Sequence, residues 1–239
     1  MKVLYELNPL TISGKSCNKV AGCVVVGKNI YTVSSIDGEG KQPVAFYKND
    51  KAIPVKTPSG STSIARHLNS ITYYDHLFYI VTRNNQDENQ IMAFDSGGII
   101  RRRWKYPRSK IATINHYSGN RFLISVSGGL SVKYRLVEIG DEIEDVGINF
   151  RALAPPGYET GNDSFYEKKR LYVTKFKDLS HSAVFLYDIS SLKNGAKFLP
   201  VDAIYTEEKG QFEIEGVGKG LIACVNRKQN DLIVKEIDH

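Results

Sequence analysis

Five short segments decide the fold class, because they repeat one strand-like pattern along the chain. They read NIYTV at 29–33, LFYIV at 77–81, RFLISV at 121–126, RLYVT at 170–174 and GLIACV at 220–225. The equivalent residues are spaced by 48, 44, 49 and 50 positions, namely Ile30, Phe78, Phe122, Leu171 and Leu221. The step from Leu221 through the C-terminus back to Ile30 again takes 48 positions. A period of about 20 to 50 residues is typical of proteins built from repeated structural units.

Each repeat contains further segments with the alternating apolar pattern of β-strands. A strand precedes each segment quoted above: GCVVV, SITYY, ATINHY, DSFY and FEIEGV. Another follows it: VAFYKND, IMAFD, RLVEI, FLYDI and IVKEI. A weaker fourth strand reads AIPVK, IIRRRWKY, EDVGINF and KFLPVDAIY in the first four repeats. The fifth repeat lacks this strand, and KVLYEL near the N-terminus can supply it.

These units predict an all-β fold, a five-bladed β-propeller with four-stranded antiparallel blades, in which the N-terminal strand closes the last blade. We expect a single domain over 1–239. Its blades should cover roughly 16–57, 64–107, 110–153, 158–206, and 210–239 together with 1–8. A lipocalin-type barrel is the structural alternative, but it needs fewer strands and does not explain the period.

Composition places the chain among ordinary globular proteins. It has 239 residues, 41% of them hydrophobic and 24% charged, and a formal net charge of +6. The three cysteines, Cys17, Cys23 and Cys224, lack metal-site spacing, so we expect reduced thiols. The N-terminus does not resemble a secretory signal and no apolar run is long enough to span a membrane. We therefore expect a monomeric cytoplasmic protein with no membrane partner.

One stretch resembles a family as well as a fold. RHLNSITYYDHLFYIVT at 66–82 resembles the blade core of uncharacterised bacterial propellers, which carry a His-x-Asn-x-x-Thr-Tyr-Tyr motif in the innermost strand. The matching residues are His67, Asn69, Thr72, Tyr73 and Tyr74. QFEIEGV at 211–217 is similar to a Glu-Gly step in the same group. The resemblance implies a propeller and carries no known activity.

Polar residues gather where the innermost strands begin, at one mouth of the predicted ring. We expect a ligand-binding site there, for a small polar ligand such as a saccharide or carboxylate, or for a protein partner. The predicted ligand-binding residues are Lys19, His67, Asn69, Asn162, Asp163 and Gln211, with Tyr73 and Phe212 as apolar walls. Thr113, Asn115 and His116 lie at nearby positions. The alternative interpretation is that these side chains form hydrogen bonds between neighbouring blades.

An enzymatic site is the second interpretation of the same mouth. Glu213 and Glu215 are two positions apart on one strand, a spacing that suits an acid and a base of a hydrolase or lyase acting on a carbohydrate or lactone-like substrate. Together with Asn69, Asn162 and Asp163 they also resemble the Glu/Asn/Asp metal site of lactonase-type propellers, which implies Ca²⁺. No other cofactor is expected and no metal ligand is assigned. Lys19 in place of an acid in the first blade argues against a five-bladed glycosidase.

A basic stretch, IIRRRWKYPRSK at 99–110, interleaves Arg and Lys with Trp104 and Tyr106. Such a pattern can bind nucleic acid or a partner protein. It is also typical of an outer propeller strand whose edge is protected by charge. The acidic DEIED at 141–145 in the next repeat can offset this charge, so we do not expect nucleic acid binding.

Overall fold

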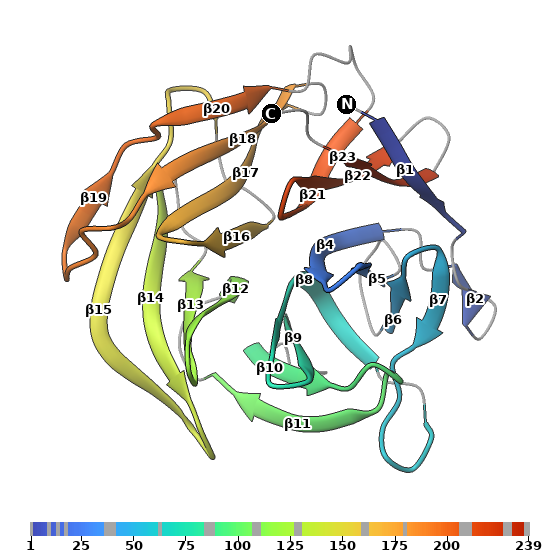
Figure 1. Cartoon of the computed structure of the whole chain (residues 1–239). Coiled ribbons are helices and arrows are strands. Elements are labelled where there is room, and N and C mark those ends of the chain that lie inside the picture. The colour runs from blue at the N-terminus through green and yellow to red at the C-terminus, as the bar shows by residue number, and fades with distance from the viewer. Residues whose placement is uncertain are drawn as a thin grey trace.

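The computed structural model describes residues 2–8, 11–12, 15–16, 19–35, 42–61, 64–83, 89–106, 111–126, 131–158, 163–178, 181–205, 212–226 and 231–236. All regular elements in these ranges are β-strands, arranged as a ring of five twisted blades (Figure 1). The predicted five-bladed propeller is therefore confirmed. The described part of the chain holds no helix that is long and apolar enough to cross a membrane.

The first two blades follow the chain order from the centre of the ring outward. Blade 1 consists of β4 (Lys19–Val26), β5 (Asn29–Ser35), β6 (Gln42–Lys48) and β7 (Lys51–Pro54). Blade 2 consists of β8 (Ile64–Tyr74), β9 (Leu77–Arg83), β10 (Asn89–Phe94) and β11 (Ile100–Lys105). A short pairing of β6 with β8 joins the two blades into one sheet.

One segment that we predicted as a single strand of blade 4 is divided between blades 3 and 4. Blade 3 consists of β12 (Ile111–Ser118), β13 (Arg121–Val126), β14 (Ser131–Ile139) and β15 (Ile143–Leu153). Blade 4 consists of β16 (Ser164–Glu167), β17 (Arg170–Asp178), β18 (His181–Asp188) and β20 (Asp202–Tyr205). The expected single strand KFLPVDAIY is divided. Its first part, in β19 (Ala196–Phe198), pairs in parallel with β15 of blade 3, and only its second part completes blade 4.

The last blade closes the ring with both ends of the chain. It consists of β21 (Phe212–Gly218), β22 (Leu221–Asn226), β23 (Asp231–Glu236) and β1 (Lys2–Leu7). Strands β1 and β23 pair antiparallel, from Lys2 opposite Glu236 to Leu7 opposite Leu232 (Figure 1). The predicted closure by KVLYEL is confirmed. A small hairpin of β2 (Thr11–Ile12) and β3 (Lys15–Ser16) lies between β1 and β4.

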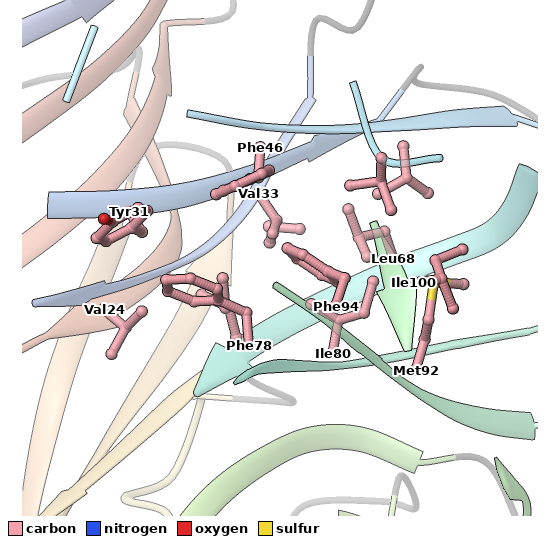
Figure 2. Packing of buried hydrophobic residues seen from close by; sticks show 14 residues of the cluster. Val24, Tyr31, Val33, Phe46, Leu68, Phe78, Ile80, Met92, Phe94 and Ile100 are labelled. Atoms are coloured by element: carbon pink, nitrogen blue, oxygen red, sulfur yellow. The ribbon is translucent and has the colours of Figure 1, made fainter. Parts of the chain in front are cut away.

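Five apolar clusters fill the five gaps between neighbouring blades. Between blades 1 and 2, the rings of Tyr31, Phe46, Phe78 and Phe94 pack with centroids 4.5 to 6.0 Å apart (Figure 2). Similar clusters lie in the other four gaps, including the gap between the last and first blades. Burial of these apolar faces is the main stabilising contribution, because each blade alone would leave both faces exposed.

Tight hairpins join the first and second strands of the blades. In blade 2 the turn residues Asp75 and His76 have φ of 47° and 62°, and in blade 4 Lys168 and Lys169 have φ of 49° and 69°. Two consecutive positive φ angles are typical of type I′ turns, whose twist matches that of the flanking strands. These turns set the register that places the beginnings of the innermost strands together at one end of the ring, which we call the mouth.

Candidate functional site

The mouth residues predicted from sequence are described to different extents. Asn162 and Gln211 lie outside the described residues. For Lys19, His67, Glu213 and Glu215 the structure describes the course of the strand, in β4, β8 and β21. Asn69 is half-buried in β8, and Asp163 is buried immediately before β16.

Irregularities interrupt the strands at both predicted pairs. In β8 the pairing register with β9 shifts on each side of Asn69, and Ser70 has a φ of 55°. In β21 the register with β22 shifts between Ile214 and Gly216, so Glu215 falls at an irregular step. Strict alternation is the basis for expecting His67 with Asn69, and Glu213 with Glu215, on one face. That basis does not hold at either pair.

Part of the ring's centre is closed by backbone contact. A Cβ atom built on Gly216 of β21 would lie 2.6 Å from the Cα of Gly22 in β4. A Cβ on Gly22 would lie 2.9 Å from the Cα of Ser70 in β8. Only residues without a Cβ allow strands to approach so closely. No ligand can therefore pass between β21 and β4, or between β4 and β8, at this level.

The side chain of Asp163 links blade 4 to blade 5. One of its carboxylate oxygens accepts a hydrogen bond from the backbone N–H of Val217, at 3.0 Å. The backbone of Asp163 is also fixed, because its N–H donates to the Thr174 hydroxyl at 2.9 Å and its carbonyl accepts from the Thr174 N–H at 3.0 Å. With 1% of its surface exposed, this aspartate ties two blades together at the mouth.

Blades 3 and 4 are joined by a chain of buried side-chain hydrogen bonds. The Asn115 amide donates to the Ser164 hydroxyl at 2.7 Å, which donates to Thr113 at 2.7 Å, which donates to Ser125 at 2.8 Å. All four side chains are buried. Thr113 and Asn115 therefore follow the alternative interpretation made from sequence, in which polar residues of the innermost strands bond between blades.

Blades 2 and 3 are tied in the same way. The Ser70 hydroxyl donates to the Ile114 carbonyl at 3.2 Å, and the Thr72 hydroxyl accepts from the His116 N–H at 3.0 Å. The His116 ring stacks on Tyr74 with centroids 4.2 Å apart. Tyr73, expected to form a wall of the site, packs instead against Phe78 within the cluster between blades 1 and 2.

Lys175 is the functional candidate that sequence reasoning missed. It lies in β17 on the face of Val173 and opposite Ala183, both in the apolar cluster between blades 3 and 4. Only 1% of its surface is exposed, and its ammonium has no hydrogen-bond partner among the described residues. Burial lowers the pKa of Lys175 from 10.5 to about 8. Since the adjacent Thr174 pairs with Asp163, Lys175 lies level with the beginning of β16, at the mouth.

A signal for Lys175 is present in the sequence. Leu171, Val173 and Lys175 occupy alternate positions of one strand, and the first two face the core. A lysine that continues a core-facing alternation is unusual, because a charged group is rarely buried without a partner. Such positions are candidates for functional sites.

The basic stretch in blade 2 packs against blade 3. Trp104 is buried, and its indole N–H donates to the Gly140 carbonyl at 2.9 Å. Nη1 of Arg102 lies 3.7 Å from Oδ1 of Asp141, and Nη2 of Arg101 lies 2.6 Å from Oδ2 of Asp95. The aromatic ring is thus unavailable for stacking with a base or a partner, and acidic residues offset part of the charge.

No group of three His, Cys, Asp or Glu side chains in the described ranges could hold a metal ion.

No protein-family model matches the chain, and no curated protein matches it by sequence. Solved structures do match in fold. A β-xylosidase, RS223, is 10% identical over 92% of both chains, with a TM-score of 0.50.

Two peptidase structures are more weakly similar. The β-propeller domain of the Trilobed protease from Pyrococcus furiosus, described as having an open velcro topology, is 11% identical over 86% of this chain and 90% of its own, with a TM-score of 0.39. A prolyl endopeptidase is 13% identical over 88% of this chain and 33% of its own, with a TM-score of 0.38. At these identities the comparisons show a shared propeller fold and no activity for this chain.

Proposed function

We propose that this protein is a binding propeller whose ligand is a small polar molecule with a carboxylate group. The proposed site lies at the mouth, at the seam between blades 3 and 4, and Lys175 is its charged anchor. The observation that carries this proposal is the buried ammonium of Lys175, which has no hydrogen-bond partner among the described residues.

The energetics of Lys175 favour a ligand over a purely structural role. A pKa of about 8 leaves most Lys175 side chains charged at pH 7, inside an apolar cluster. Isolated burial of a charge is unfavourable, and methionine would fill the same space without that cost. An anion bound beside the ammonium would offset the lost hydration and restore the ordinary preference for the charged form.

The surroundings of Lys175 favour a small ligand. Val173 on the same strand and Ala183 on the neighbouring strand belong to the apolar cluster beside Lys175, and its ammonium is covered by protein atoms, which leaves no room for a large ligand. A lysine is a compact point charge with three donors, suited to one carboxylate. The long apolar stem of the side chain would let the ammonium reach toward the mouth, where β17 ends at Asp178.

The remaining mouth residues keep their predicted roles within this proposal. Asn69 and His67 of β8, Lys19 of β4, and Asn162 and Gln211 would supply hydrogen bonds to polar groups of the ligand. A hydrolase or lyase that uses Glu213 and Glu215 is the second candidate. The interrupted register of β21 removes the geometric argument for pairing these two carboxylates.

A thermal-shift screen tests the proposal, with calorimetry on any compound that stabilises the protein. The panel contains mono- and dicarboxylates and sugar acids, with the matching neutral sugars as controls. A ligand present at 100 times its Kd stabilises the native state by about 2.7 kcal/mol. We expect a carboxylate to stabilise the wild type, and we expect this effect to be lost in Lys175→Met.

The matched control is Lys177→Met, which removes an exposed lysine from the same strand. This variant should bind the carboxylate like the wild type. The proposal is wrong if a carboxylate binds Lys175→Met as tightly as the wild type, if only neutral sugars bind, or if no carboxylate in the panel binds.

A further inference from the structure

A hollow on the outer part of blade 3 is lined by residues other than those of the proposed mouth site. Its volume is about 220 Å³, and Lys133 of β14, Asn149 and Arg151 of β15, and Gly195 and Lys197 around β19 contribute to its lining. Figure 1 shows β14, β15 and β19 side by side at the outer edge of the ring.

The three cations of this hollow form one row across three strands. Lys133 pairs directly with Arg151, and Arg151 pairs directly with Lys197. Neighbouring strands lie about 4.8 Å apart, so the row spans roughly 10 Å. Like charges directly opposite each other destabilise a sheet. The row is therefore unfavourable unless an anion neutralises it.

Other cations of blade 3, and one of blade 2, have acidic partners. Within blade 3, Nε of Arg121 lies 3.4 Å from Oε2 of Glu138, and Nη1 of Arg135 lies 3.4 Å from Oδ2 of Asp145. Arg101 likewise pairs with Asp95 in blade 2. Within the described ranges, by contrast, no acidic side chain forms an ion pair with Lys133, Arg151 or Lys197.

The pairing of β19 with β15 places Lys197, the third cation, in the row. Strand β19 leaves blade 4 and joins β15 in parallel. The Gly195 N–H donates to the Asn149 carbonyl at 2.7 Å, and the Asn149 N–H donates to the Asn194 side-chain oxygen at 3.1 Å. Gly195 has a φ of 78°, which favours glycine. These bonds fix the segment that carries Lys197.

We propose that this hollow binds a diphosphate group. The arginine at its centre presents a planar fork that suits phosphate oxygens, and a lysine on each side supplies a further positive charge. A row of roughly 10 Å matches two linked phosphates better than one. A hollow of about 220 Å³ is smaller than typical sites for drug-sized ligands, so it should take the phosphates and leave any attached group outside.

Isothermal titration calorimetry with inorganic pyrophosphate tests this inference. We expect the wild type to bind pyrophosphate at least roughly tenfold more tightly than orthophosphate, since a second charge-assisted contact contributes on that order. Arg151→Gln should weaken pyrophosphate binding by at least the same factor. Arg121→Gln removes the same charge from an ion-paired arginine of the same blade and should leave the affinity unchanged.

Two further arms complete the test. ADP should bind about as tightly as pyrophosphate, because only the phosphates enter the hollow. Without any anion, Arg151→Gln should unfold at a higher temperature than the wild type because the repulsion in the row is relieved. Equal affinity for pyrophosphate and orthophosphate, equal losses in Arg151→Gln and Arg121→Gln, or binding of ADP without pyrophosphate would overturn the inference.

Discussion

Replacing Lys175 with methionine should stabilise the protein, although it alters one of its most buried side chains. The pKa of Lys175 falls from 10.5 in water to about 8 through burial alone. A pKa change of one unit corresponds to about 1.4 kcal/mol, so the charged side chain costs ~3 kcal/mol of folding stability at pH 7. Methionine has a similar length and no charge, so Lys175→Met should recover most of this free energy.

The sign of the pH dependence makes the prediction specific. Below pH 8 both the folded and the unfolded states carry the proton, so the cost is fully present. Between pH 8 and pH 10.5 the unfolded state binds more protons than the folded state, and the stability of the wild type rises with pH. The advantage of Lys175→Met should therefore shrink from ~3 kcal/mol at pH 7 to below about 1 kcal/mol at pH 10.

Urea denaturation at the two pH values, followed by circular dichroism, measures both differences. The exposed Lys177→Met variant should change the unfolding free energy by less than about 0.5 kcal/mol at either pH. A loss of stability in Lys175→Met at pH 7 would show that the buried charge is not unfavourable. An equal gain in stability at pH 7 and pH 10 would show that Lys175 does not lose its proton on folding at pH 10, which also contradicts the prediction.

Three further predictions concern the fold. Gly216→Ala should destabilise the protein by roughly 1–3 kcal/mol in urea titrations, because its Cβ would lie 2.6 Å from the Gly22 backbone. The control Gly140→Ala should be nearly neutral, because a Cβ at this position would meet no atom within 4 Å. The buried Trp104, the single tryptophan, should fluoresce at shorter wavelength in the native than in the unfolded state, and equal maxima would contradict its burial. Burial also raises the pKa of the Cys23 thiol, so Ellman's reagent should label Cys23 only upon unfolding, and rapid native labelling mapped to Cys23 by mass spectrometry would contradict this.

The propeller can be predicted from the sequence because the patterns that indicate its strands are local and are repeated along the chain. The period from Ile30 to Leu221, and the missing fourth strand of the last repeat, are enough to derive five blades and their closure by β1. The path of the chain through β19 is different. Its partner, β15, lies more than 40 positions earlier, and no local pattern distinguishes pairing across two blades from pairing within one.

The site is less predictable than the fold because it depends on where strands are irregular. The interpretation of the innermost strands assumes strict alternation, whereas the register shifts at Asn69 and near Glu215 interrupt it. Buried bonds between blades, such as that from Asp163 to Val217, need the three-dimensional arrangement of two blades. Lys175 shows the opposite case: its core-facing place is readable from alternation, but a lysine in a strand is ordinarily assigned to the solvent side.

In the proposed site, the ammonium of Lys175 is a buried charge at the mouth of the propeller that binds an anion. The most direct measurement is a heteronuclear NMR titration of the Lys175 ammonium, assigned by comparison with Lys175→Met, with and without a saturating carboxylate. We predict a pKa near 8 for Lys175 in the free protein and a clear increase of this pKa when the carboxylate is bound. A pKa near 10.5 in the free protein, or a value that the carboxylate does not raise, would contradict it.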